Sequence, residues 1–160
     1  MATTYGADAD SSNTRLVYHE AGVDDGMANP PVPIVSQVTS SDFDIGDGHN
    51  FGFVWRLIPD LTFDGSEVNQ PSAMFTVLPR TFPGAPYGPS NNPSVTSTQD
   101  YQNVRTYAIQ EFTQQVYVRI RGRQMAFKVG SGVIGSATEG VGVQWQLGVP
   151  RIDIRADGRR

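Results

Sequence analysis

Apolar and polar residues alternate through residues 116–129, and this alternation predicts a half-buried β-strand. After Gly122 the apolar positions change parity. A shift of one residue turns every side chain of a strand to its other face, so one regular strand cannot keep both runs in the core. A β-bulge at Gly122 is the simplest solution. The core side then carries Val118, Ile120, Met125, Phe127 and Val129, and the other face carries Arg119, Arg121, Gln124 and Lys128.

A second alternation with a change of parity occupies residues 141–155. Gly148 and Pro150 separate its two parts, which indicates a bulge or an edge strand and excludes the centre of a sheet. Its apolar positions are Val141, Val143, Trp145 and Leu147, followed by Ile152 and Ile154 on the other parity, with Arg151, Asp153 and Arg155 facing away. The polar faces of the two segments carry four arginines: Arg119, Arg121, Arg151 and Arg155. They form either an ordinary solvated face or a surface that docks on a partner.

Further strands are expected in the first two thirds of the chain. A short strand is expected at Arg15–His19, and an edge strand at residues 32–38. Residues 73–78 are apolar on both faces and predict a central strand, and a strand is also expected from Tyr107 and Ile109. The longest predicted core face has odd parity: Phe51, Phe53, Trp55, Leu57, Leu61 and Phe63.

Between these strands, residues 81–103 are too rich in proline and glycine to hold a strand or a helix. We expect Phe82 and Tyr87 of this loop to pack on the chain's own sheet or on a neighbouring subunit. No amphipathic helix is indicated, and about eight to ten short strands are expected. The predicted fold is all-β, with antiparallel sheets arranged as a β-sandwich or like a propeller blade, joined by long loops rich in proline and glycine.

Composition supports this fold and bounds the domain organisation. The 160 residues include 17 glycines and 11 prolines but only 18% charged residues, which favours short strands and turns over a helical bundle. We expect a flexible N-terminal arm at residues 1–13 and a single all-β domain at residues 14–160. The chain has no cysteine, no apolar run of membrane-spanning length and no signal-peptide pattern, so synthesis in the cytoplasm is expected.

Charge is distributed unevenly along the chain. Residues 1–104 hold 3 basic and 12 acidic side chains, for a net −9, and residues 105–160 hold 9 basic and 4 acidic ones, for a net +5. Such asymmetry indicates either pairing within the sheets or head-to-tail docking of subunits, acidic side to basic side. Nucleic-acid binding is not expected, because the overall pI is near 5.0 and no helix or row of stacking aromatics accompanies the arginines.

No catalytic, cofactor or metal site is expected. The sequence lacks the glycine-rich nucleotide loops, the nucleophile elbow and the zinc-binding helix motif. Asp42, Asp44 and Asp47 invite a calcium interpretation, but their spacing departs from the calcium-binding loop, since Gly46 replaces a ligand and no glutamate closes the loop. A strand that runs into a turn explains this segment better, and the chain is not expected to be an enzyme.

Five segments together resemble one family of proteins. They are residues 41–48, 56–60, 119–125, 140–148 and 150–160. The last three read as R-x-R-G-R-Q, then G-x-x-W-x-L-G, then R-x-D-x-R-x-D-G-R-R. Their order and spacing resemble the C-terminal part of tailed-bacteriophage virion proteins of the tail nozzle and head-to-tail type. Those proteins are several times longer, and their turn at the position of residues 130–140 is shorter.

The resemblance implies a structural component of the virion, most simply a tail nozzle or adaptor protein. It implies propeller-like sheets, other tail proteins as partners, a homo-oligomeric ring of six subunits, and a place in the virion tail after assembly in the host cytoplasm. Alternatives are a carbohydrate- or receptor-binding tail module and a capsid decoration protein. Candidate subunit-interface residues are Arg119, Arg121, Arg151, Arg155, Phe82 and Tyr87.

Overall fold

The protein is built from β-strands throughout the part that the structure describes. The computed structural model describes residues 3–7, 14–18, 22–25, 31–44, 48–85, 87, 105–131 and 140–158, with the backbone alone for 3–7, 14–18 and 25. These residues form 14 strands and no helix, and all strand pairs are antiparallel. The predicted all-β fold class is therefore confirmed.

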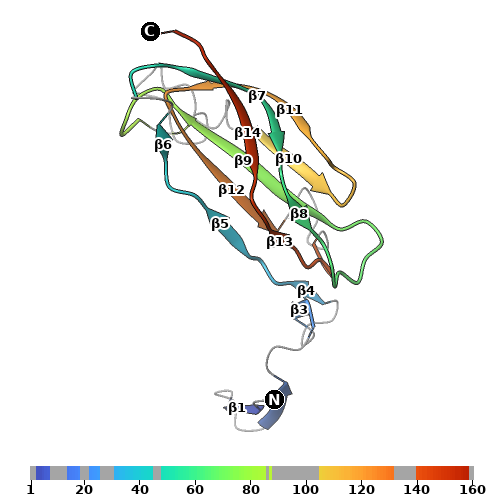
Figure 1. Cartoon of the computed structure of the whole chain (residues 1–160). Helices are drawn as coiled ribbons and strands as arrows, with labels where there is room; N and C mark the ends of the chain where they lie inside the picture. The colour runs from blue at the N-terminus through green and yellow to red at the C-terminus, as the bar shows by residue number, and fades with distance from the viewer. Residues whose placement is uncertain are drawn as a thin grey trace.

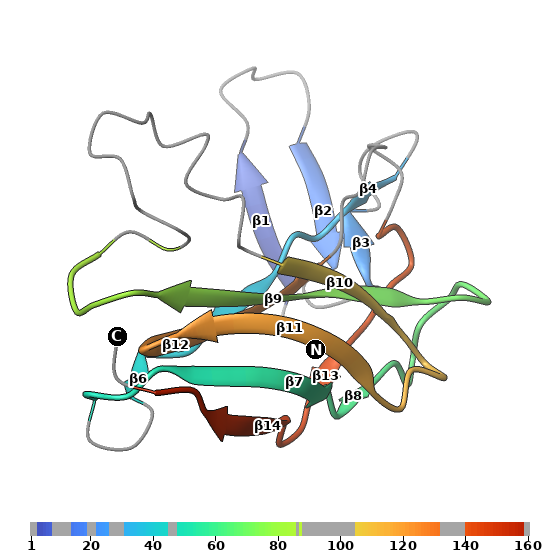
Figure 2. The same ribbon diagram turned by 90° about the horizontal axis from the view of Figure 1, so that it is seen from above.

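Two larger sheets form the body of the molecule (Figures 1 and 2). The five-stranded sheet has the order β10-β9-β12-β5, and β6 also pairs with β12. Its strands are β10 (Arg105–Gln110), β9 (Ser72–Arg80), β12 (Gln124–Ser131), β5 (Gln37–Thr39) and β6 (Phe43–Asp44). The three-stranded sheet has the order β11-β7-β14, from β11 (Val116–Gly122), β7 (Gly52–Ile58) and β14 (Arg151–Ala156).

Three small two-stranded sheets complete the described structure. They pair β1 (Thr3–Ala7) with β2 (Thr14–Tyr18), β3 (Asp24–Asp25) with β4 (Val32–Pro33), and β8 (Leu61–Thr62) with β13 (Gln146–Leu147). Figure 1 shows the β1–β2 pair standing apart from the two larger sheets. Part of the expected flexible N-terminal arm, residues 3–7, is thus a paired strand.

Both larger sheets supply the hydrophobic core, which lies between them as in a β-sandwich. β9 is central, as predicted, and its Phe75 has no exposed surface. Since successive side chains of a strand point to opposite sides, each sheet turns one set of residues inward and the other set outward. The core consists of Val54, Leu57, Val118 and Ile120 from the three-stranded sheet and Phe75, Val77, Ile109, Met125 and Val129 from the five-stranded one.

The parity change at Gly122 marks a corner between the two sheets. β11 pairs with β7 up to Gly122, and β12 begins at Gln124 in the other sheet. Only Arg123 lies between them, and its backbone N–H donates to the Arg80 carbonyl oxygen at 2.8 Å. The predicted bulge at Gly122 is therefore wrong, since the chain leaves one sheet there and enters the other. Such a corner reverses the parity of the apolar positions just as a bulge would.

The predicted side-chain directions around this corner are confirmed. Arg119 and Arg121 are exposed, whereas Met125 and Val129 have no exposed surface. Phe127 packs against the core from a half-buried position.

A bulge does occur in β7, at Trp55. Arg56 and Val54 pair with the consecutive residues Asp153 and Ile154 of β14, so Trp55 has no partner there. Because the extra residue shifts parity, Val54 and Leu57 both reach the core. The predicted odd-parity core face is therefore wrong for Phe53 and Trp55, which are only half-buried and lie on the outer side.

The segment before β14 differs from its prediction as well. Residues 140–145 form turns and irregular backbone, with positive φ at Gly140 and Gly142, and only Gln146–Leu147 pairs as a strand. The break at residues 148–150 is confirmed, and β14 is an edge strand. Arg151 and Arg155 are exposed, as predicted for its outward side.

Replacing Phe75 with alanine should reduce the free energy of unfolding by about 3–5 kcal/mol, because the ring is completely buried between the sheets. Phe127→Ala should cost less, since that ring is half-buried and stacks on Phe75 with centroids 5.6 Å apart. Urea denaturation followed by circular dichroism measures both changes. Equal losses for the two variants would contradict the placement of Phe127 at the margin of the core.

Candidate protein-interaction surface

The outer side of the three-stranded sheet gathers the four arginines that the sequence singled out. Arg121 of β11 and Arg155 of β14 both lie opposite Phe53 of β7, and Tyr117 and Asp153 both lie opposite Arg56. Directly opposed residues in antiparallel strands point to the same side of the sheet. We call this surface the arginine face: Arg56, Tyr117, Arg119, Arg121, Arg151, Asp153, Arg155 and Asp157, with the rings of Phe51, Phe53 and Trp55 among them.

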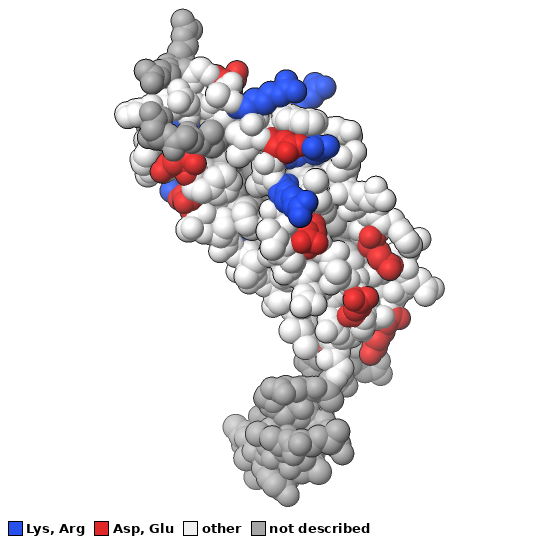
Figure 3. Space-filling view, in the orientation of Figure 1, with Lys and Arg blue, Asp and Glu red and all other residues white. Residues whose placement is uncertain are grey.

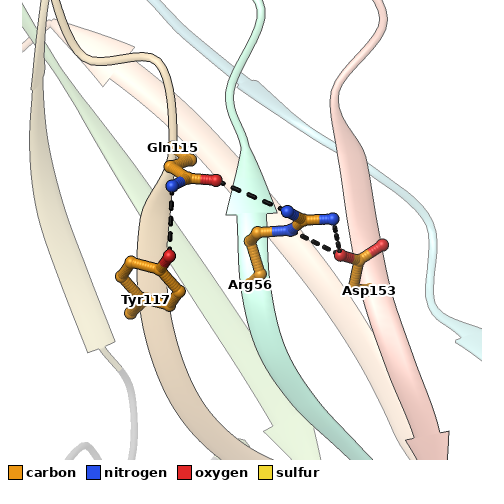
Figure 4. A network of polar contacts seen from close by, with 4 residues as sticks. All are labelled: Arg56, Gln115, Tyr117 and Asp153. Atoms are coloured by element: carbon orange, nitrogen blue, oxygen red, sulfur yellow. Dashed lines mark hydrogen bonds and ion pairs between the residues drawn. The ribbon is translucent and has the colours of Figure 1, made fainter.

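Arg56 is at the centre of a polar network that spans all three strands (Figure 4). Its Nε and Nη2 atoms each lie 2.5 Å from Asp153 Oδ2, and its Nη1 donates to Gln115 Oε1 at 3.5 Å. The Gln115 side-chain amide donates to the Tyr117 hydroxyl at 3.1 Å. A planar guanidinium with three donors in use is held in one orientation, so the face has a defined shape.

Aromatic rings support four guanidinium groups on or beside this face. Arg121 and Arg123 lie over the Phe51 ring, at 4.3 and 4.9 Å from its centroid. Arg56 and Arg155 lie at 4.8 and 5.4 Å from the centroid of Trp55, whose ring stacks with Tyr117. These distances are within the range of cation–π attraction, which acts while the charges still face the solvent.

Sequence reasoning missed these aromatics, because it assigned Phe53 and Trp55 to the core and found no aromatics that accompany the arginines. The bulge at Trp55 turns this ring outward. Neither glycine nor proline marks the bulge in the sequence, so no local signal was present to find it.

Charge on the arginine face is only partly neutralised. Arg121 donates through Nε to the Asp157 carboxylate and through Nη2 to the Asp157 carbonyl oxygen at 3.0 Å. Among the described residues, Arg119, Arg151 and Arg155 have no carboxylate partner. Figure 3 shows basic side chains gathered beside acidic ones in the upper part of the molecule, whereas acidic side chains alone stand at the lower right.

Tyr87, one of the two aromatic candidates, is bound within its own chain. Its hydroxyl donates to Asp42 Oδ1 at 2.9 Å, and its ring lies under the Arg80 guanidinium at 4.0 Å. Arg80 Nη1 in turn lies 2.8 Å from Asp42 Oδ2. Phe82, the other aromatic candidate, is 51% exposed. The loop thus packs Tyr87 on its own sheet, one of the two expected arrangements, while residues 88–103 lie outside the described part.

The acidic segment that invited a calcium interpretation is used for packing. Asp42 binds Arg80 and Tyr87, and Asp44 Oδ1 accepts from the Gln124 side-chain amide at 2.8 Å. Asp47 lies outside the described residues. Within the described ranges, no group of three or more histidine or acidic side chains could hold a metal ion, and no helix is long and apolar enough to cross a membrane.

A hollow of about 530 Å³ lies elsewhere, lined by Trp145, Gln144 and Glu67 among others. The Trp145 indole N–H donates to Ser131 Oγ at 3.2 Å, and its ring packs against the core. This tryptophan therefore has a structural role beside the hollow.

The segments that carry the family resemblance contact one another in the fold. Asp44 binds Gln124, Arg56 binds Asp153, and Arg121 binds Asp157. The carboxylate of Asp60 accepts from the Val149 N–H at 2.6 Å, and its carbonyl oxygen accepts from the Gly148 N–H at 2.9 Å. A Cβ atom at Gly148 would overlap the Asp60 carboxylate, so a larger residue there would displace it. These contacts thus lie in both larger sheets and at the turn that follows β7.

No protein-family model matches the chain, and a search of curated proteins finds no match. The functional assignment therefore depends on the motifs and on the geometry of the arginine face.

The environment of Tyr87 predicts a dependence of stability on pH. Burial and the hydrogen bond to Asp42 raise the pKa of Tyr87 above its ordinary value of 10.0. A group whose pKa is raised by folding stabilises the fold fully below its unfolded pKa and loses that contribution as pH rises through the folded value. We expect Tyr87→Phe to lose stability at pH 8 and to show a smaller further decrease above pH 10 than the parent chain. Urea titrations at pH 8 and pH 11 measure this difference. The account would be contradicted if the variant and the parent chain lost the same free energy of unfolding between the two pH values.

Proposed function

We propose that this protein is a structural component of a tailed-bacteriophage virion, a tail nozzle or adaptor protein that acts by assembling with other virion proteins. The proposal combines the resemblance of five segments to that family with the surface chemistry of the fold. In the virion the chain forms a ring with further copies of itself, sixfold as the resemblance implies, and docks on neighbouring tail proteins.

Contacts among the family segments hold the arginine face together. Arg121 binds Asp157 across 36 residues of sequence, and Arg56 binds Asp153 across 97 residues. The residues that carry the resemblance therefore build the surface to which the proposal assigns assembly.

The observation that carries the assembly role is the arginine face itself. Rings or carboxylates position three of its guanidinium groups in advance, those of Arg56, Arg121 and Arg155, so these groups lose little freedom when a partner binds. Arginine binds carboxylates through two parallel hydrogen bonds, and three arginines of the face have no carboxylate partner in the described part of the chain. Acidic side chains of a neighbouring subunit fit this surface in a head-to-tail ring.

Mass spectrometry of purified virus particles, followed by cryo-microscopy of the portal vertex, tests the virion role. We expect the protein in the particle at the head-to-tail junction. A place on the capsid surface would favour the decoration protein, a place at the distal tip would favour the receptor-binding module, and absence from particles would contradict the proposal.

A double charge reversal, Arg121→Glu with Arg155→Glu, tests the arginine face within the particle. We expect particle yield to decrease by about tenfold or more, as a loss of about 1.4 kcal/mol of contact energy would produce. Arg105→Glu, an exposed arginine on β10 of the other sheet, is the matched control and should assemble normally. Circular dichroism must show all variants folded. Normal yield from the folded double variant would exclude these two arginines as necessary contacts.

A further inference from the structure

β14 is an edge strand, and no strand in the described part of the chain pairs with its outer side. It pairs with β7 on one side only, and this pairing continues past the strand, since the Asp157 N–H donates to the Phe51 carbonyl oxygen at 2.7 Å. In Figure 2, β14 forms the lower margin of the molecule, and no described strand lies beyond it. An open edge presents unpaired N–H and C=O groups that can accept another strand.

The side chains of β14 alternate without interruption. In the pairing of β14 with β7 the extra residue, Trp55, belongs to β7, so β14 itself keeps a strict period of two. The arginine face receives Arg151, Asp153 and Arg155, followed by Asp157, so positive and negative charges alternate along it. Ile152, Ile154 and Ala156 point to the opposite, inner side.

We propose that two copies of this chain join through their β14 strands, antiparallel, across a twofold axis at Ile154. In this register Arg151 lies opposite the partner's Asp157, and Asp153 lies opposite the partner's Arg155. Each pair occurs twice by symmetry, so every charged side chain of the strand meets the opposite charge. Directly opposed residues are cross-strand neighbours, and opposite charges there stabilise the pairing.

The neighbouring registers lack this complementarity. An axis at Asp153 would place Arg151 opposite the partner's Arg155, and Asp153 opposite the partner's Asp153, which are like charges. An axis at Ile152 would pair Arg151 with the partner's Asp153 but leave Arg155 opposite the partner's Val149. The charge pattern therefore selects the register centred on Ile154.

This pairing also gives partners to side chains of β14 that the single chain leaves exposed to solvent. Arg151 and Arg155 have no carboxylate partner among the described residues, and each gains one in the pair. Ile154, which is 37% exposed, lies on the axis and contacts the partner's Ile154. The two three-stranded sheets become one sheet of six strands, with both arginine faces on the same side.

The inference is independent of the proposed virion role. It concerns two copies of the purified chain and requires no other virion protein. A twofold contact buries the same patch on both copies, whereas a head-to-tail ring joins two different patches. Either interface can therefore be present without the other.

Crosslinking tests the register directly. The chain has no cysteine, so Ile154→Cys introduces a single thiol. Opposed Cβ atoms lie roughly 4.5–5.5 Å apart, within reach of a short thiol-reactive crosslinker, and we expect covalent dimers. Ile152→Cys is the matched control on the same strand and side. Its thiols would be about 13 Å apart, four residues along the pair, and should not crosslink. Equal or faster crosslinking of the Ile152 variant, or none at Ile154, would overturn the proposal.

A charge exchange measured by sedimentation provides the second test. Arg155→Asp alone places like charges together twice, as does Asp153→Arg alone, so each variant should dimerise at least about tenfold more weakly. Mixing the two restores both complementary pairs, and a mixed dimer should form. That rescue requires both variants to be folded. Unchanged dimerisation of Arg155→Asp, or a mixture that stays monomeric although both variants show the parent's circular dichroism, would contradict the pairing.

Discussion

The fold depends on a tight corner at Gly122 and Arg123, where the chain passes from one sheet directly into the other. A Cβ atom at Gly122 would lie 3.0 Å from the Gln124 carbonyl oxygen and 3.1 Å from that of Arg80, so a side chain there would push the surrounding backbone apart by a few tenths of an ångström. The Arg123 N–H fixes the corner through its bond to Arg80. Because the passage takes a single residue, β11 and β12 are joined directly at one end, and the core forms between their sheets.

The same corner sets the chemistry of the outer surface. It leaves Arg121 on the outward side of one sheet and directs Met125 inward from the next. The bulge at Trp55 then adds a ring to the outward side, where arginines lie over it. The backbones of Asp153 and Asp157 pair with β7 and with Phe51 beside it, and their carboxylates bind Arg56 and Arg121. The same two residues therefore hold the edge of the sheet and orient the arginines on its outer side.

The sequence predicted features that depend on local alternation. The central position of β9, the outward arginines and the exclusion of β14 from the centre of its sheet all follow from which positions are apolar and where glycine and proline interrupt. Features that depend on distant partners were not predictable. A corner and a bulge reverse parity in the same way, so the pattern at Gly122 could not distinguish them. The bulge at Trp55 has no glycine or proline to mark it, and the bond from Tyr87 to Asp42 joins residues 45 positions apart.

The unfolding free energy of Gly122→Ala tests the corner most directly. Overpacking against two backbone oxygens should destabilise the protein by about 1–3 kcal/mol. Gly130→Ala provides a comparison within β12, since its added methyl group would first meet an oxygen at 3.3 Å, and it should cost less. The account predicts a clearly lower urea midpoint for Gly122→Ala than for Gly130→Ala. A Gly122→Ala protein as stable as the parent would contradict a close-packed corner between the sheets.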